Sequence, residues 1–183
     1  MKKNILLVLS LFLVMNCFAQ ESEETENETE TENETEVEVE TSVYYLIRHA
    51  EKNRSDKKDK DPKLTKAGNN RAIYWAEVFK NVKFDAVYST DYNRTRETAI
   101  PTAEANQLEI TSYHPFKIDF KQFLADTEGE TTLIVGHSNT TPDFVNRLLN
   151  EEEFEHIDDK NNGNLYIVTI TGDSKTVQLL TLN

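Results

Sequence analysis

Residues 43–52 read VYYLIRHAEK, an apolar and aromatic run that ends abruptly in charged and polar side chains. A short apolar run bounded in this way is typical of a strand that is buried on both faces of a sheet. Two later segments repeat the pattern: residues 84–88 read FDAVY, residues 131–135 read TTLIV, and a polar stretch follows each of them. We therefore expect three buried strands whose carboxyl ends carry polar side chains.

Helical segments separate and follow these strands. Residues 65–78 place apolar side chains near helical spacing, and residues 92–105 and 140–149 read as further helices. Two closing runs, residues 165–170 and 177–180, flank a Thr-Gly-Asp-Ser turn and predict an antiparallel hairpin at the sheet edge. The alternation predicts an α/β fold with three layers, α/β/α, and a mostly parallel central sheet with an antiparallel edge.

Charge is distributed unevenly along the 183 residues. The chain carries 20 Lys+Arg and 33 Asp+Glu, a net charge of −13, but residues 21–40 alone hold eleven Glu and no base. The acidity therefore belongs mainly to one segment, and residues 41–183 have the composition of an ordinary soluble domain. The absence of a basic stripe argues against nucleic-acid binding. The single Cys excludes an internal disulfide framework and a cysteine-based metal cluster.

The first 19 residues predict a secretory signal peptide. Two lysines precede an apolar run that is too short to span a bilayer comfortably, and small residues flank Phe18 before the chain turns polar. Cleavage after Ala19 would export the protein to the periplasm or the medium without stable membrane insertion. An uncleaved anchor is one alternative. A lipid anchor on Cys17 is another, less favoured because Asn16 stands where a small residue is required.

Residues 20–41 predict a disordered spacer, and residues 42–183 a single folded domain. The spacer alternates Glu with Thr, Asn and Ser, so it cannot bury enough apolar surface to offset its chain entropy. A calcium-binding or partner-docking role is the alternative. We disfavour it because a run of carboxylates without fixed spacing has no preformed coordination geometry.

Each predicted strand ends in side chains that bind phosphate well. The first strand runs into Arg48 and His49, the second into a segment that holds Arg94, and the third into His137 and Asn139. In open α/β sheets ligands bind beyond the carboxyl ends of the strands, so we expect these side chains to converge. Guanidinium groups match tetrahedral oxyanions, and the helix that begins near Asn139 adds N–H donors. The sequence therefore predicts a phosphate-binding site.

Four motifs in this order resemble the histidine phosphatase superfamily, also called the phosphoglycerate mutase-like proteins. They are LIRHAEK at residues 46–52, LTKAGNNRA at 64–72, STDYNRTRETA at 89–99 and GHSN at 136–139. Each motif alone is a weak signal, but together they are specific and cover essentially the whole predicted domain. The resemblance implies a phosphoglycerate mutase-like fold and a small, phosphatase-type member of the family.

The resemblance also implies roles for the matched residues. His49 resembles the nucleophile that becomes phosphorylated, and His137 resembles the second histidine of the phosphate pocket. Arg48 and Arg94 resemble the phosphate clamp, and we expect Asn139 to contact substrate as well. Physical chemistry agrees, because a neutral imidazole can attack phosphorus in line while guanidinium groups neutralise the equatorial oxygens. No metal or cofactor is expected.

The acid that protonates the leaving oxygen is less well marked. The family usually carries a Glu or Asp between the clamp arginine and the second histidine, but no acid there has a recognisable motif around it. We prefer Glu51, because its loop follows the nucleophile directly. Its alternative role is to pair with Lys52 or Arg54. The other candidates lie in residues 106–130: Glu109, Asp119, Asp126, Glu128 and Glu130.

Several polar residues have simpler expected roles. We expect Arg96 to pair with the neighbouring Glu97, His114 to be solvated in a loop that edges the pocket, and His156 to lie on the surface. The loops at residues 53–63 and 106–120 are expected to form the remaining pocket walls.

The combined prediction is an exported phosphomonoesterase that acts on a phosphorylated small molecule through a phosphohistidine intermediate. Two alternatives remain open. One is a non-catalytic module of the cell envelope that binds phosphorylated ligands. The other is a phosphoglycerate mutase-type phosphotransferase, which we disfavour because the mutases carry longer insertions over the pocket than this domain can hold.

Overall fold

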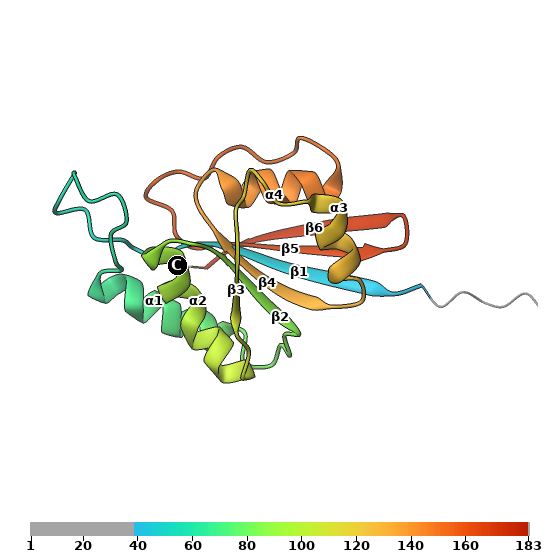
Figure 1. Ribbon diagram of the computed structural model, residues 1–183, viewed down its shortest axis with the longest axis horizontal. Coiled ribbons are helices and arrows are strands. Elements are labelled where there is room, and N and C mark those ends of the chain that lie inside the picture. Colours follow the sequence, from blue (N-terminus) through green and yellow to red (C-terminus); the bar gives the residue numbers. More distant parts are fainter. Residues whose placement is uncertain (1–38, 183) are drawn as a thin grey trace, which may run out of the picture. The chain divides into compact units, whose positions relative to one another are not determined.

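The computed structural model describes residues 39–182 (Figure 1). The expected signal peptide, including Cys17, and residues 20–38 of the expected spacer lie outside these residues. Thr41, the last residue of that expected spacer, is already the first residue of a strand and pairs with Thr171. The first strand therefore includes the last residue of the expected spacer.

The domain contains six strands and four helices, and the predicted strand, helix and hairpin segments all form. In chain order they are β1 (Thr41–Arg48), α1 (Lys66–Val78), β2 (Ala86–Thr90), α2 (Asn93–Asn106), β3 (Ile110–Tyr113), α3 (Phe120–Asp126), β4 (Thr131–Gly136), α4 (Thr140–Leu149), β5 (Asn164–Thr171) and β6 (Ser174–Thr181).

One six-stranded sheet runs through the domain in the order β3-β2-β4-β1-β5-β6. The first four strands in this order are parallel, whereas β5 pairs antiparallel with β1 and β6 antiparallel with β5. The turn between β5 and β6 uses Gly172 at a φ of 56°, a left-handed conformation that glycine adopts without steric cost. The prediction of a mostly parallel sheet with an antiparallel edge is confirmed.

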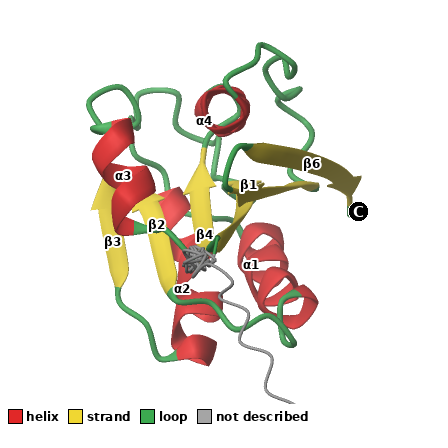
Figure 2. Ribbon diagram, turned by 90° about the vertical axis from the view of Figure 1, so that its right-hand side faces the viewer, coloured by secondary structure: helices red, strands yellow, loops and turns green. Residues whose placement is uncertain are grey.

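Helices cover both faces of the sheet, which confirms the expected three layers (Figure 2). Helices α1 and α2 lie on one face, where Trp75 and Phe79 pack with Ile47 of β1. Helices α3 and α4 lie on the other face, where Phe123 and Phe144 join a separate apolar cluster. Because both faces of the parallel strands are buried, these strands read as apolar runs in the sequence.

The topology brings three strand ends to one edge of the sheet. Strand β4 lies between β1 and β2, and Arg48 at the end of β1 is opposite Gly136 at the end of β4. Parallel strands direct their carboxyl ends to the same side, so the polar residues that follow β1, β2 and β4 emerge together. The fold therefore assembles the segments that the sequence analysis singled out.

The segment after β1 is fixed against the first turn of α1. Thr65 caps this helix by accepting a hydrogen bond from the Gly68 amide, and its own amide donates to the Glu51 carbonyl at 2.8 Å. A Cβ atom on Gly68 would lie 2.3 Å from the Glu51 carbonyl oxygen, so only glycine fits there. This contact explains the glycine of the LTKAGNNRA motif and holds the chain just after His49.

Residues 106–120 differ from the expected loop, because they contain β3 and lead directly into α3. Strand β3 has four residues, of which only Tyr113 is buried, and α3 has seven, of which only Phe123 is buried. Elements this short present too few apolar positions to show a period in the sequence.

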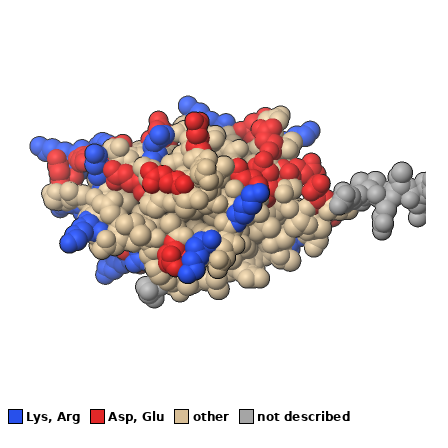
Figure 3. Space-filling view, turned by 90° about the horizontal axis from the view of Figure 1, so that it is seen from below, with Lys and Arg blue, Asp and Glu red and all other residues tan. Residues whose placement is uncertain are grey.

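The surface carries charges of both signs. Figure 3 shows Lys and Arg side chains interspersed with Asp and Glu on the face that it displays. Among the helices of residues 39–182, none combines the length and the apolar character that a membrane crossing would require.

Candidate active site

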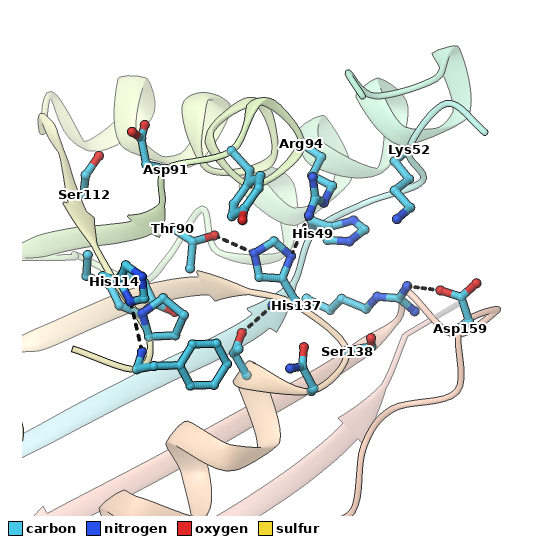
Figure 4. Close-up of a pocket in the computed structure, with 17 residues that line it drawn as sticks. His49, Lys52, Thr90, Asp91, Arg94, Ser112, His114, His137, Ser138 and Asp159 are labelled. Carbon is cyan, nitrogen blue, oxygen red and sulfur yellow. Dashed lines mark hydrogen bonds and ion pairs between the residues drawn. The ribbon is translucent and has the colours of Figure 1, made fainter. Parts of the chain in front are cut away.

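A cavity of about 740 Å³ opens at the carboxyl ends of β1, β2 and β4. Arg48, His49, Arg94, His137 and Asn139, which the sequence marked as phosphate-binding, all line it (Figure 4). They come from three separate segments of the chain, and the parallel order of the sheet brings them together.

Arg48 is the last residue of β1 and is almost fully buried, with 1% of its surface exposed. Its Nη1 atom donates hydrogen bonds to the carbonyl oxygens of Asp158 and Asn161, both at 2.9 Å, and Nη2 donates to Asp159 Oδ1 at 2.7 Å. The Nε atom of Arg48 is buried without a partner among the described residues. The guanidinium group is therefore fixed in place, with one donor unused.

His49 is also buried, and its orientation is set by one short hydrogen bond. Nδ1 lies 2.7 Å from the carbonyl oxygen of Ala50, so it carries the ring proton and donates it. The neutral ring then has its lone pair on Nε2, which is free to accept a proton or to act as a nucleophile. Burial, the largest cause, together with the charges of Arg48, His137 and Arg94 lowers the pKa of His49 from 6.5 to about 3, although the Ala50 hydrogen bond opposes them. The Nε2 nitrogen is therefore unprotonated at neutral pH.

Arg94 lies in the first turn of α2 and is held more loosely than Arg48. Its guanidinium carbon lies 4.3 Å from the centre of the Tyr92 ring, and Nη1 lies 3.5 Å from Asp61 Oδ1. The Nε and Nη1 atoms are buried without a hydrogen-bond partner in the described part of the chain. Burial lowers the pKa of Arg94 and Asp61 opposes that effect, but a guanidinium stays charged in proteins. Arg94 therefore has donors available for an anion.

His137 follows β4, and its imidazole contacts Thr90 at the end of β2 and Arg94 on α2. The Thr90 hydroxyl lies 2.9 Å from Nε2, and because this hydroxyl donates to Thr95, it accepts from the imidazole. Nδ1 then accepts from Arg94 Nη2 at 3.4 Å, and the centre of the His137 ring lies 5.5 Å from that of His49. Burial lowers the pKa of His137 to about 4, followed by the charges of Arg94, Lys52 and Arg48.

A second group of residues, which the sequence analysis did not identify, positions these side chains. The segment between α4 and β5 supplies Asp159 and the two carbonyl groups that hold Arg48, and Asn162 Nδ2 donates to the His49 carbonyl at 2.8 Å. In the sequence this segment reads DDKNNG, which signals only a turn. Thr98 accepts from the Ala50 amide at 2.9 Å and donates to the Arg94 carbonyl at 2.7 Å, which links the segment after His49 to the first turn of α2. The Thr-Ala pair of the third motif was the available signal.

Glu51, the preferred acid, is not among the residues that line the cavity. Its Oε1 atom lies 2.8 Å from Nε of Arg71 on α1, rather than beside Lys52 or Arg54. The side chain turns toward the helix because Gly68 lets the helix approach so closely. The structure therefore separates Glu51 from the four residues that it brings together.

The alternative acids of residues 106–130 do not line the cavity either. Among residues 39–182, the carboxylates that line it are Asp91 and Asp159. Asp159 pairs with both Arg54 and Arg48, and the Arg54 and Arg48 hydrogen bonds lower its pKa to about 2 against the opposing effect of burial. It is therefore ionised at neutral pH, whereas Asp91 is largely exposed and lies 3.6 Å from Arg96.

The remaining polar predictions are partly confirmed. His114 is exposed at the cavity edge, as expected, and its Nδ1 accepts from the Phe116 amide. His156 is exposed on the surface. Arg96, however, has Asp91 rather than Glu97 as its carboxylate partner, because Glu97 accepts a hydrogen bond from the Leu64 amide at 2.7 Å.

Within residues 39–182, no three His, Cys, Asp or Glu side chains come together as a candidate metal site. The charged groups available to a ligand in the cavity are those of the arginines, Lys52 and the two aspartates. Positive side chains surrounding two neutral imidazoles suit a multiply charged anion.

Comparison with known proteins points to the same family that the sequence motifs resemble. The model of the histidine phosphatase superfamily (branch 1) matches residues 44–117, which include Arg48, His49 and Arg94. None of the curated proteins compared with the chain matches it.

Solved structures share the fold at low sequence identity. The protein histidine phosphatase SixA complexed with tungstate is 16% identical, with a TM-score of 0.63 over 76% of this chain and 96% of that chain. A mycobacterial glucosyl-3-phosphoglycerate phosphatase complexed with VO3 is 13% identical, with a TM-score of 0.61 over 78% of this chain and 99% of that chain. A phosphoglycerate mutase from Bacillus anthracis is 13% identical, with a TM-score of 0.60 over 78% and 94% of the two chains. The phosphoglycerate mutase-like fold is thus confirmed.

Proposed function

Because residues 44–117 match the model of the histidine phosphatase superfamily (branch 1), we propose that this chain is a member of that superfamily and a phosphomonoesterase that forms a phosphohistidine intermediate on His49. The observation that carries the proposal is the state of the His49 ring. Nδ1 donates its proton to the Ala50 carbonyl, so the lone pair of the neutral ring is on Nε2. His49 lines the same cavity as Arg48, Arg94 and His137.

In the first step, the Nε2 lone pair of His49 forms a bond to phosphorus and the P–O bond to the alcohol breaks. The bonding electrons leave with the alcohol oxygen, which takes up a proton. Arg94 and the Nε atom of Arg48 offer buried donors to the peripheral oxygens, where negative charge is spread in the transition state. The Arg48 donor needs little reorganisation, because Arg48 is already fixed by three hydrogen bonds.

In the second step, a water oxygen attacks phosphorus and the N–P bond breaks. The electron pair returns to Nε2 of His49, and the water gives up the proton that balances the one taken by the alcohol. The sum is ester plus water to alcohol plus inorganic phosphate. Splitting the displacement in two replaces one difficult step with two easier ones.

Hydrolysis is favoured over the two alternative functions. A phosphate-binding module needs positive charge but has no use for an imidazole with a fixed tautomer and a free Nε2. A mutase must retain its phosphorylated intermediate away from water, and the connection between β3 and α3 at the cavity edge is short, at residues 114–119.

The test is turnover of 4-nitrophenyl phosphate by the wild type and by His49→Gln. We expect the variant to lose at least about 10³-fold in kcat/KM, because the nucleophile is absent. We also expect vanadate to inhibit the wild type. His156→Gln is the matched control, since it makes the same change at an exposed histidine outside the cavity. No turnover across a range of esters and pH values would favour the binding module.

We further propose that the protein acts after export, on a phosphorylated small molecule outside the cytoplasm. Residues 1–19 support this proposal, because they have the charged, apolar and small-residue regions of a signal peptide. Expression of the whole chain in a bacterial host, followed by fractionation and N-terminal sequencing, tests it. A mature chain that starts at Gln20 supports export with cleavage, whereas a lipid on Cys17 would show that the protein is anchored.

A further inference from the structure

Lys52 lines the same cavity as His49 and lies three residues after it along the chain. Among residues 39–182, no carboxylate lies within ion-pair distance of its ammonium group. Figure 4 shows the Lys52 side chain on the Arg94 side of the cavity, away from His114. The ammonium group therefore belongs to the phosphate end of the cavity rather than to its far edge.

The backbone of Lys52 is held firmly. Lys52 forms an isolated antiparallel bridge with Leu64, and the Asn53 amide donates to the Lys63 carbonyl at 2.8 Å. On the other side, the Thr65 amide donates to the Glu51 carbonyl. These contacts fix the Cα atom, so only the side-chain torsions of Lys52 remain free to adjust to a ligand.

The positive charge of Lys52 lacks the compensation that the two clamp arginines have. Asp159 lies 2.7 Å from Arg48, and Asp61 lies 3.5 Å from Arg94. Partial burial lowers the pKa of Lys52, and the charges of Arg94 and Arg54 lower it further, while the charge of Asp159, which lies beyond ion-pair distance, opposes them in part. Because positive neighbours make this position unfavourable for a cation, a bound anion would relieve the repulsion.

We propose that Lys52 is a third cation of the phosphate site, whose ammonium group contacts the phosphoryl oxygens beside Arg48 and Arg94. This inference rests on the proposed phosphatase function and extends its catalytic machinery. A monoester dianion brings two negative charges, and each arginine already shares its charge with a carboxylate. Lys52 supplies the positive charge that the anion still lacks, and it lies where charge develops on the transferring group.

The electrostatic reach of Lys52 supports contact with the phosphoryl group rather than with a distant part of the substrate. Lys52 is the second-largest charge effect that lowers the pKa of His137, and Arg94 is the largest charge effect on Lys52 itself. Because Lys52 interacts electrostatically with both His137 and Arg94, its ammonium group lies close to the point where these two residues approach His49.

The experiment compares Lys52→Gln and Lys52→Arg with the wild type. Lys63→Gln is the matched control: it removes the same charge from the opposite side of the bridge, and its exposed side chain does not line the cavity. Binding of inorganic phosphate and of vanadate is measured by titration calorimetry. Turnover is measured with phenyl phosphate, 4-nitrophenyl phosphate and 4-carboxyphenyl phosphate, and thermal unfolding shows that each variant is folded.

We expect Lys52→Gln to weaken phosphate and vanadate binding by about 10- to 100-fold, as for the loss of a hydrogen bond to a charged group. The kcat/KM of all three esters should fall by a similar factor. Lys52→Arg should retain most of the binding, and Lys63→Gln should match the wild type.

Three results would overturn the proposal. Unchanged phosphate binding would show that Lys52 does not contact the anion. A loss confined to the carboxyphenyl ester would show that Lys52 recognises a second acidic group, and a loss confined to phenyl phosphate would make it a proton donor to a poor leaving group. If the wild type fails to turn over any ester, the proposed hydrolysis fails, and the phosphate titration still decides the role of Lys52.

Discussion

Arg48 and Arg94 face the same cavity from different elements, and the protein holds them in opposite ways. Arg48 ends a central strand and is fixed by two backbone carbonyls and Asp159. Arg94 lies on the first turn of a helix, rests on the Tyr92 ring, and keeps two nitrogen atoms without hydrogen-bond partners in the described residues. Arg48 thus stabilises the fold and also offers positive charge to an anion, whereas Arg94 keeps its hydrogen-bond donors available for a ligand.

The largest expected effect is that of Arg48→Ala, which should damage stability and activity together. The substitution leaves the carbonyls of Asp158 and Asn161 without their donor and removes one cation from the site. We expect a loss of about 2–4 kcal/mol in the free energy of unfolding, because several hydrogen bonds to a charged group disappear. Urea unfolding and kcat/KM for 4-nitrophenyl phosphate measure the two effects. An unchanged free energy of unfolding in this variant would show that Arg48 does not stabilise the fold, which would contradict the difference between the two arginines.

Arg94→Gln should separate activity from stability. The guanidinium of Arg94 makes few hydrogen bonds within the protein, so we expect the free energy of unfolding to change by less than about 1 kcal/mol. The kcat/KM should nevertheless fall by about 10²- to 10³-fold, as when one transition-state donor is removed. The same two assays apply. A variant that is as unstable as Arg48→Ala would show that Arg94 is structural as well.

Asp159→Asn tests whether the fixation of Arg48 matters for catalysis. Asparagine keeps an oxygen that can accept from Arg48 but loses the charge that pairs with Arg48 and Arg54. We expect kcat/KM to change by about 10-fold at most, since the two carbonyl contacts to Arg48 remain. Phosphate binding by titration calorimetry is the more sensitive measurement. Complete loss of activity would give Asp159 a direct part in the reaction.

The two arginines should also act on different histidines. After burial, Arg94 is the largest cause that lowers the pKa of His137, whereas Arg48 is the largest charge effect on His49. Arg94→Gln should therefore raise the pKa of His137 more than that of His49. Titration of the imidazole signals by NMR measures both shifts in the same sample, and equal shifts would contradict the assignment.

The same lowered pKa values predict how stability depends on pH. The unfolded chain binds protons on these histidines near pH 6.5, whereas the folded protein binds them only near pH 4 and 3. The unfolded state thus binds more protons between these values, and stability should fall as the pH is lowered from about 6.5 toward 4. Thermal unfolding of His137→Gln should show a weaker dependence on pH than that of the wild type.

The smallest expected effect is that of Glu51→Gln. Its carboxylate pairs with Arg71 outside the cavity lining, so we expect kcat/KM to stay within about 3-fold of the wild type. A drop of 10² or more that is larger for esters with poor leaving groups would restore Glu51 as the catalytic acid.

The Arg48 and Arg94 regions also differ in what their sequence could predict. The strand ends that carry Arg48, His49 and His137 were predictable, because buried parallel strands are apolar runs and their ends converge. The partners of Arg48 were not, since two of the groups that hold it are backbone carbonyls of residues more than 100 positions away. Because every residue has a backbone carbonyl, the sequence does not show which carbonyls accept these hydrogen bonds.

Glu51 shows a second limit of the sequence. Proximity to His49 in the chain suggested proximity in space, but the close packing of Gly68 places Glu51 beside α1. The short elements β3 and α3 show a third limit, since their few buried side chains carry no period. Long, regular and buried segments were predicted well, whereas individual side-chain partners depended on tertiary packing.

The most direct test of the phosphohistidine mechanism is to trap the intermediate. The wild type is mixed with a ³²P-labelled ester, quenched in alkali within milliseconds, digested, and examined by mass spectrometry. We predict one phosphoryl group, stable to alkali and labile to acid, on the peptide that contains His49, and no label in His49→Gln. Label on another residue, or turnover without any phosphoenzyme, would contradict the mechanism.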